Sequence, residues 1–568
     1  MLYRIINGTV IDGTGGKAFE ADVEINDGRI TAVAAPGSFL SRGGPTEESR
    51  PKGRGSARYI DASGCYVSPG FIDAHSHADL GPYVPNKLKL KLRQGISTEV
   101  VGQCGFSPAP MPAERQAEWL KYYVPGSPLD SWPWQSTAEF YEALRSRGLP
   151  LNFMPFVGHG TLRFAVKGDS SAPMGPKELD LMENLLEQAF AEGAAGLSFG
   201  LIYVPALCAD KEELRRAARC AARNRRILSV HLRSESNELL EALKEMIKLQ
   251  SETGVRLHIS HLKAIGRGRA GSNQSDNQAK IEQALELIEK NQLSFDSYPY
   301  TYGSTSLLSM LPPHLFAGKT VRSALSDLSN PQLRQETAAL LRGDRREPPG
   351  LPWDNLAQLL GWDQIELVHI PPGKDTDLIG KNLAAAAEDR RRSPEELTIQ
   401  LAMQYGGQVR IIDEFSCEAT LKKIIGHPSG ILSSDSLLGG RLHPRVSGSF
   451  PRVLSKYTLE KGGGPLTLEE AVHRMTGRSA QFFGLKNRGT IEVGTTADIA
   501  VWSSDFKDVS RRSAPEQPAR GLEFLCINGR MVLGPDKNEA EGMPKIANMN
   551  AGRILTAPHY VFPQRKYK

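Results

Sequence analysis

Short apolar runs alternate with longer amphipathic segments over most of the chain. The runs have the length of buried strands, and two of the segments between them, 176–192 and 210–224, carry apolar residues at helical spacing. Eight such runs follow one another: Gly70–Asp73, Ser97–Val101, Leu151–Val157, Ala194–Phe199, Ile227–Val230, Arg256–Ile259, Leu293–Phe295 and Gly430–Ser433. Eight strands alternating with helices are typical of a (β/α)8 TIM-like barrel, an α/β fold.

The two ends of the chain have a different pattern. Near the start, Tyr3–Asn7 and Ala21–Asn26 alternate between apolar and polar residues, and 60–67 resembles a further strand. Near the end, 489–502 returns to a strand pattern with glycine-containing turns. These segments predict one small β-sandwich domain built from both chain ends.

We therefore divide the chain into three parts. The sandwich takes residues 1–68 and 485–535, the barrel takes 69–484, and a polar C-terminal tail takes 536–568. Within the barrel, 310–395 is longer than a normal connection between strands, which predicts an insertion that is either a lid or a peripheral decoration.

Two smaller features interrupt this organisation. A stretch at 36–57 is rich in glycine, proline and charge, which predicts a loop insertion. Within the long insertion, apolar spacing predicts an amphipathic helix near 330–341, followed by a charged turn.

Composition narrows the possible partners. The 568 residues include 69 Lys and Arg and 64 Asp and Glu, a net charge of +5, and the basic residues are scattered. Nucleic acid is therefore not an expected partner. No apolar run approaches the roughly 18 to 20 residues that span a bilayer, and Met1–Gly8 is not the start of a signal peptide. Six dispersed cysteines do not form a disulfide framework, so we expect a cytoplasmic protein without membrane association. The oligomeric state stays open.

Metal-binding side chains follow several of the predicted barrel strands. His75 and His77 lie two residues apart, so a strand would direct both to one face, and neutral imidazole is a good zinc ligand. Active sites of such barrels lie at the carboxyl ends of the strands. Further candidates stand after the second, fifth, sixth and eighth strands: Cys104, His231, His261 and Asp435. The sequence therefore predicts a divalent-metal site.

This constellation resembles the amidohydrolase superfamily, and within it the N-acyl-D-amino-acid deacylases, or D-aminoacylases. The superfamily features are the H-x-H pair, single histidines after strands five and six, and an aspartate after strand eight. The more specific deacylase motifs are Gly102-Gln103-Cys104-Gly105, Gly158-His159-Gly160-Thr161-Leu162-Arg163, Gly196–Tyr203, His261-Leu262-Lys263, Asp296–Tyr300, Gly303-Ser304-Thr305, His443-Pro444-Arg445 and Ala497-Asp498.

The resemblance implies a zinc ion tightly bound by Cys104, His231 and His261. It further implies that His75 and His77 line a second, weaker divalent-metal position or hold the nucleophilic water. Many superfamily members bridge two metals with a carboxylated lysine after strand four, but here that strand reads Leu197-Ser198-Phe199-Gly200. The choice between one metal and two therefore stays open.

The implied reaction is hydrolysis of the amide of an N-acyl-D-amino acid, a small-molecule substrate, to a carboxylate and a free D-amino acid. In this reaction Asp435 would act as general base and then as general acid. Lys263 is predicted to bind the substrate α-carboxylate, and the matched positions Tyr203, Tyr298 and Ser304 would add hydrogen bonds.

Other polar residues near the rim each allow two roles. Arg233 would clamp a carboxylate or form a structural ion pair, and His159 would contact the oxyanion or orient the third strand. Arg445 is similarly ambiguous.

Two other functions fit the same scaffold. One is hydrolysis of cyclic amides, as in hydantoinases and dihydroorotases, or of dipeptides, which the missing lysine disfavours. The other is a non-catalytic barrel, which the complete set of ligands disfavours. The preferred amino-acid side chain and acyl group stay open.

Overall fold

The computed structural model describes residues 1–39, 57–123, 129, 131–266, 274–346, 348, 350–438, 443–459, 463–538 and 543–556. Most of the predicted loop insertion at 36–57 and the last twelve residues of the predicted tail lie outside these ranges. Within the described ranges, no helix is both long enough and apolar enough to cross a bilayer.

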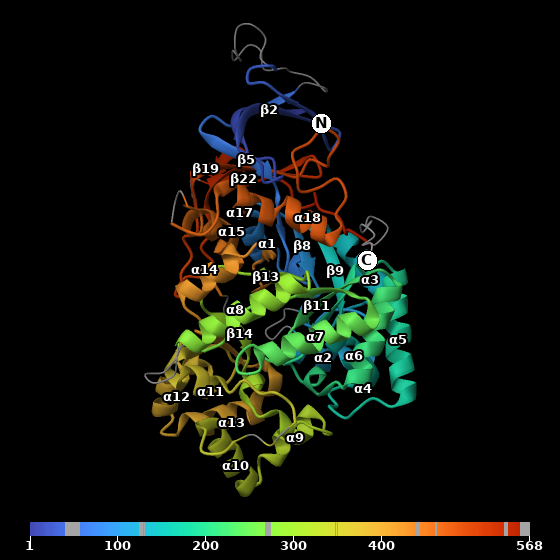
Figure 1. Cartoon of the computed structure of the whole chain (residues 1–568), viewed down its shortest axis with the longest axis vertical. Coiled ribbons are helices and arrows are strands. Elements are labelled where there is room, and N and C mark those ends of the chain that lie inside the picture. Colours follow the sequence, from blue (N-terminus) through green and yellow to red (C-terminus); the bar gives the residue numbers. More distant parts are fainter. Residues whose placement is uncertain are drawn as a thin grey trace.

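Eight parallel strands form a barrel in the described part of the chain (Figure 1). Their order in the sheet is their order in the sequence, and each corresponds to one predicted strand, so the (β/α)8 prediction is confirmed. The strands are β6 (Phe71–Asp73), β8 (Ile96–Val101), β9 (Asn152–Gly158), β10 (Gly196–Gly200), β11 (Ile227–His231), β12 (Arg256–Ile259), β13 (Ser294–Ser297) and β17 (Gly430–Leu432).

Few direct contacts close the barrel between its first strand, β6, and its last strand, β17. The Ala74 backbone N–H donates to the Leu432 carbonyl oxygen over 3.4 Å. Just beyond, β7 (Ser76–His77) pairs in parallel with β18 (Ser436–Leu437). This closure brings the two predicted histidine ligands next to the segment that contains Asp435.

Helices surround the barrel. The two predicted from apolar spacing are present as α5 (Pro176–Ala191) and α6 (Lys211–Arg223). Asp210 caps α6, because its carboxylate accepts a hydrogen bond from the Glu213 backbone N–H. The others are α1 (Pro85–Leu92), α2 (Ala113–Tyr123), α3 (Thr137–Arg147), α4 (His159–Lys167), α7 (Leu239–Thr253), α8 (Gln274–Lys290), α14 (Glu418–Gly426), α15 (Arg445–Lys456), α17 (Leu468–Met475) and α18 (Gly477–Phe483).

Strands from both chain ends form one further sheet and share one apolar core. The predicted strand 60–67 is in fact two strands, because a turn at Gly64 with φ of 71° separates them. The strands are β1 (Tyr3–Val10), β2 (Phe19–Asn26), β3 (Arg29–Ala34), β4 (Arg58–Asp61), β5 (Cys65–Pro69), β19 (Ile499–Lys507), β20 (Arg520–Ile527), β21 (Arg530–Asn538) and β22 (Met543–Ile546).

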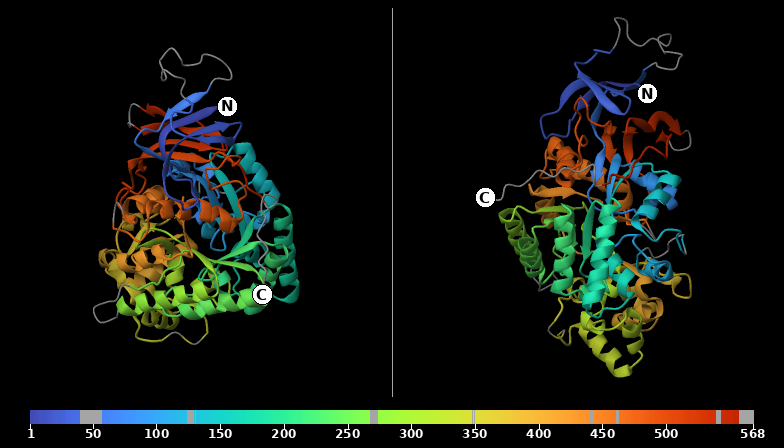
Figure 2. Two further views of the ribbon diagram at one scale, coloured as in Figure 1. Left: turned by 45° about the horizontal axis from the view of Figure 1, so that its top comes forward. Right: turned by 90° about the vertical axis from the view of Figure 1, so that its right-hand side faces the viewer.

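A helical insertion lies between β13 and β17, at the end of the molecule opposite this sheet (Figures 1 and 2). It has its own apolar core, and a small antiparallel sheet forms its base. Its elements are β14 (Gly303–Ser306), α9 (Val321–Asp327), α10 (Pro331–Arg342), α11 (Leu356–Leu360), β15 (Ile365–His369), α12 (Leu383–Asp389), α13 (Pro394–Tyr405) and β16 (Arg410–Asp413). The helix predicted near 330–341 is α10.

Candidate active site

Cys104 lies at the centre of a buried cluster of imidazoles. Its Sγ is 3.3 Å from His75 Nε2, 3.6 Å from His231 Nδ1 and 3.2 Å from His261 Nε2. One atom each of His75, Cys104 and His261 lies within 4.8 Å of the others, a spacing at which one metal ion can contact all three. Thiolate with imidazole is a ligand set typical of zinc.

A second group of ligand atoms adjoins the first through His75. Asp435 Oδ1 lies 3.5 Å from His75 Nε2 and 3.3 Å from His77 Nε2. The other carboxylate oxygen, Oδ2, accepts a hydrogen bond of 2.7 Å from Arg445 Nη1. The barrel therefore brings all six residues predicted from the rim into one continuous cluster.

Three residues of this cluster have left-handed backbone conformations. The φ angles are 52° at Cys104, 32° at His261 and 49° at Asp435. For a residue other than glycine such a conformation costs on the order of 1–3 kcal/mol and is concentrated at functional sites. The backbone thus turns sharply at each strand end and directs these side chains inward.

The glycines beside Cys104 allow its loop to approach the neighbouring strands. Gly102 and Gly105 have φ angles of 76° and 77°. A Cβ atom at Gly102 would collide with the Phe156 backbone, and one at Gly105 would lie 2.9 Å from Gly200 N. Glycine is required at both positions because the loop packs directly on β9 and β10.

Carboxylates contact the outer sides of the imidazole rings. Glu235 Oε2 lies 3.3 Å from His231 Nε2, and its Oε1 lies 3.1 Å from His261 Nδ1. Asp296 Oδ2 lies 3.4 Å from His75 Nδ1. Carboxylates in this position orient histidine ligands and increase their basicity.

Electrostatics in the cluster favour a bound cation. Burial raises the pKa of the Cys104 thiol, but His75, His261 and His231 together hold that pKa well below its usual range. Burial also opposes ionisation of Asp435, yet Arg445 and His261 hold the pKa of its carboxyl well below the usual value. A thiolate and a carboxylate thus meet in a buried space, as a divalent-metal site requires.

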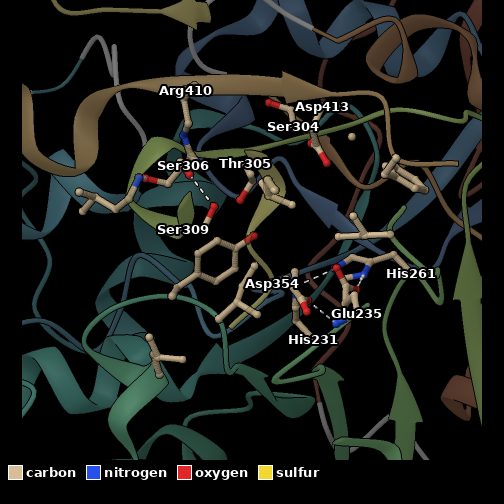
Figure 3. A pocket seen from close by; sticks show the side chains of 18 of the residues that line it. His231, Glu235, His261, Ser304, Thr305, Ser306, Ser309, Asp354, Arg410 and Asp413 are labelled. Atoms are coloured by element: carbon tan, nitrogen blue, oxygen red, sulfur yellow. Dashed lines mark hydrogen bonds and ion pairs between the residues drawn. The ribbon is translucent and has the colours of Figure 1, made fainter. Parts of the chain in front are cut away.

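The cluster opens into a pocket between the barrel and the insertion (Figure 3). The predicted substrate-binding residues that line it are Tyr203, Arg233, Lys263, Tyr298 and Ser304.

His159 and Arg233 were each predicted to have one of two roles, and their contacts favour the structural one. His159 is absent from the pocket lining in the described residues, and its Nε2 lies 2.8 Å from Glu213 Oε1. Arg233 lines the pocket, but its guanidinium donates to the Leu207 carbonyl oxygen over 2.6 Å and pairs with Glu245 at 3.2 Å. These contacts favour the structural ion pair of the two roles that the sequence allows.

Lys263 occupies a different place from the one expected of a simple carboxylate clamp. Its Nζ donates to Glu235 Oε1 and lies 2.8 Å from both that atom and His261 Nδ1. The Lys263 ammonium group therefore already pairs with Glu235, the carboxylate that contacts both His231 and His261.

Several polar residues of the site were not predicted from the sequence. Glu235 stands four residues after His231, and Asp296 directly follows the buried core of the seventh strand, so both had a positional signal. Asp354 and Arg410 come from the insertion, and no pattern in the sequence relates them to the barrel rim. Asp354 accepts hydrogen bonds of 2.7 Å from the Glu235 backbone and from Ser234 Oγ.

Comparison with known proteins adds independent information. Residues 58–310 and 432–533 match the amidohydrolase family model. The chain is 30% identical to the N-acyl-D-glutamate deacylase of Alcaligenes xylosoxydans xylosoxydans, over 93% of each protein.

Two solved structures are similar over nearly their full length. One is a D-aminoacylase with a binuclear metal center (28% identity, TM-score 0.77, covering 98% of this chain and 99% of that one). The other is the N-acyl-D-glutamate deacylase from Bordetella bronchiseptica in complex with zinc and a phosphonate inhibitor that mimics the tetrahedral intermediate (28% identity, TM-score 0.76, covering 98% and 99%).

Proposed function

The chain belongs to the amidohydrolase family, and on that basis we propose that it is a zinc-dependent hydrolase of N-acyl-D-amino acids. The products would be a carboxylate and a free D-amino acid. The observation that carries this proposal is the convergence of Cys104, four histidines and Asp435 in one buried cluster, three histidines and Asp435 of which line the pocket. The similarity to a deacylase bound to zinc and a tetrahedral mimic supports the same chemistry.

We assign the tight zinc position to Cys104, His231 and His261, and a second, weaker position to His75 and His77. Cys104 Sγ lies 3.6 Å from His231 Nδ1 and 3.2 Å from His261 Nε2, and thiolate with imidazole suits zinc. His75 is within reach of both positions, because its ligand atom groups with those of Cys104 and His261 as well as with those of His77 and Asp435. When bound, zinc would supply Lewis acidity to the scissile carbonyl and to the attacking water.

Asp435 would carry the proton during the reaction. Its Oδ1 faces His75 and His77, where the attacking water would lie, while Arg445 holds Oδ2. The carboxylate would accept a proton from the water and then donate it to the departing amine nitrogen. Arg445 keeps Asp435 ionised and fixes its orientation, so that the same oxygen serves both steps.

The α-carboxylate of the substrate must lie close to the scissile amide. Two cations are placed suitably around the Tyr298 ring, with Lys263 Nζ 5.9 Å and Arg445 Cζ 5.0 Å from its centroid. We therefore propose that Lys263 and Arg445 supply the positive charge that binds the substrate α-carboxylate. Tyr203, Tyr298 and Ser304 would add hydrogen bonds from the pocket wall.

We also propose that the protein works in the cytoplasm. Its cysteines are free thiols, and Cys104 must remain reduced to bind metal. A reducing compartment meets this requirement.

The experiment that tests the function compares matched N-acetyl-D- and N-acetyl-L-amino acids. Zinc-loaded protein would be incubated with the methionine, leucine, phenylalanine, glutamate and glutamine derivatives, and the released amine measured. Cleavage restricted to the D series, and lost after chelation, is the expected result. Absence of cleavage by protein with bound zinc would refute the proposal, and equal cleavage of both series would refute the D preference.

A further inference from the structure

One aspartate of the insertion contacts the loop that supports the candidate zinc ligands. Asp354 lies just before α11, and its two carboxylate oxygens each accept a hydrogen bond of 2.7 Å, one from Ser234 Oγ and one from the Glu235 backbone N–H. Ser234 and Glu235 follow β11, the strand that ends at His231. Figure 3 shows Asp354 beside Glu235 and His231. The insertion is therefore hydrogen-bonded directly to the loop between β11 and α7.

Glu235 connects this loop to the metal site. Its carboxylate lies 3.3 Å from His231 Nε2 and 3.1 Å from His261 Nδ1, so it contacts both imidazoles that are assigned to the tight zinc position. A carboxylate in this place sets the orientation of a histidine ring and its strength as a ligand. The direction of the Glu235 side chain depends in turn on where the Glu235 backbone is held.

Two hydrogen bonds hold the Glu235 backbone, one at each of its polar atoms. Its carbonyl oxygen accepts a hydrogen bond of 2.7 Å from the Ile265 N–H, in the loop after β12. Its N–H donates to Asp354 Oδ2. The barrel thus supplies one anchor of this residue, and the insertion supplies the other.

Asp354 has a well-defined position within the insertion. The next residue, Asn355, donates from Nδ2 to the Leu340 carbonyl oxygen of α10 over 3.0 Å, and its Oδ1 accepts a hydrogen bond from the Gln358 N–H of α11. Leu356 is buried in the apolar core of the insertion. Because the backbone around Asp354 is already ordered, little further conformational entropy is lost when its carboxylate contacts the loop.

We propose that Asp354 is a positioning residue through which the insertion orients the candidate zinc ligands. Asp354 fixes the Glu235 backbone, and Glu235 in turn aligns His231 and His261. This inference rests on the proposed function, in which these two histidines bind zinc. It gives the insertion a role other than that of a lid or a peripheral decoration, because the tight metal position is complete only when the insertion is docked on the barrel.

Zinc affinity, measured by competition with a coloured chelator, tests this role without a substrate. Asp354→Leu removes both acceptor oxygens and has a side chain of similar size. We expect the zinc affinity to fall about 3- to 10-fold, as the loss of one or two hydrogen bonds would cause. Asp354→Asn should retain most of the affinity, because its side-chain oxygen still accepts from the Glu235 N–H. Asp363→Leu is the matched control, since Asp363 is an exposed aspartate of the same insertion, and it should bind zinc like the wild type.

A double-mutant cycle distinguishes positioning through Glu235 from a direct effect of Asp354 on the metal. Glu235→Ala leaves no carboxylate to position, so adding Asp354→Leu to it should lower the zinc affinity by less than about 2-fold further. A second readout uses Co²⁺ in place of zinc, because its visible absorption bands depend on the geometry of the ligands. These bands should shift in Asp354→Leu and match the wild type in Asp354→Asn and Asp363→Leu.

The positioning role and the proposed function fail in different ways. If the wild type binds zinc and Asp354→Leu binds it equally well, or with unchanged Co²⁺ bands, the positioning role is refuted and the function stands. Fully additive effects of Asp354→Leu and Glu235→Ala would refute the role as well. Asp354→Ala, which removes the same oxygens, replaces Asp354→Leu if that variant does not fold. If the wild type binds no zinc, the proposed function fails, and the positioning role fails with it.

Discussion

Glu235→Gln offers a direct test of how the metal site is held. Glu235 contacts two candidate ligands at once, with Oε2 3.3 Å from His231 Nε2 and Oε1 3.1 Å from His261 Nδ1. The same Oε1 accepts a hydrogen bond of 2.8 Å from Lys263. Glutamine has nearly the same shape, but it carries no charge and only one acceptor oxygen, so it cannot satisfy all three partners.

The expected effect has two components. Loss of a carboxylate that orients histidine ligands typically weakens metal binding or activity by about 10- to 100-fold. At 1.36 kcal/mol for each factor of ten, this corresponds to about 1.4 to 2.7 kcal/mol of zinc-binding free energy. Lys263 also loses the anion that neutralises it in a buried site, which destabilises the folded protein further.

Zinc affinity should be measured by competition with a coloured chelator, and zinc content by mass spectrometry after dialysis. Glu238→Gln is the control, because Glu238 is an exposed residue three positions further along the same loop. The control should bind zinc like the wild type. An unchanged zinc affinity in Glu235→Gln would refute the role that we assign to this carboxylate.

Three further predictions follow from the same region. Asp435→Asn should lower kcat/KM by about 10²- to 10⁴-fold with zinc content unchanged, and retained activity would exclude Asp435 as the base. Lys91→Met should destabilise the protein by about 3–5 kcal/mol in urea unfolding, because it leaves the buried carboxylates of Asp73 and Glu99 without their cation, and an unchanged midpoint would contradict this. Burial raises the pKa of Asp354 to about 6, so the folded protein holds this proton more tightly than the unfolded chain and stability falls as the pH rises from about 4 to about 6. Asp354→Asn should flatten that dependence in thermal unfolding.

The barrel could be predicted because each of its strands is buried on both faces. A doubly buried strand appears in the sequence as a short apolar run, and the functional residue follows directly after it. His231 and His261 are examples, since each stands at or just beyond the end of a predicted strand. That these two histidines lie close together could be predicted from the parallel order of the strands. The alternation of strands with helices indicates that order.

The roles of the charged residues were harder to predict, because they depend on partners far away in the sequence. His159 has the position expected of an active-site residue, yet it faces Glu213 of α6, which is 54 residues away. Arg233 is directed to Glu245 of α7 and to backbone carbonyl groups. Arg410 shows the reverse case, since only the pairing of β14 with β16 brings it to the pocket.

The joint between the first and last barrel strands shows why the candidate ligands depend on buried charge. The direct contacts across this joint are few, but Asp73 bridges it, since its Oδ1 accepts a hydrogen bond of 2.8 Å from the Ser434 backbone N–H. Lys91 Nζ reinforces the bridge, with distances of 2.8 Å to both Asp73 Oδ2 and Ser434 Oγ. Asp73 lies two residues before His75, and Ser434 directly precedes Asp435. The left-handed backbone conformation of Asp435 is strained, so the surrounding contacts must stabilise it. The buried ion pairs of Lys91 therefore position the two halves of the site relative to each other, and a purely apolar joint would lack that directional constraint.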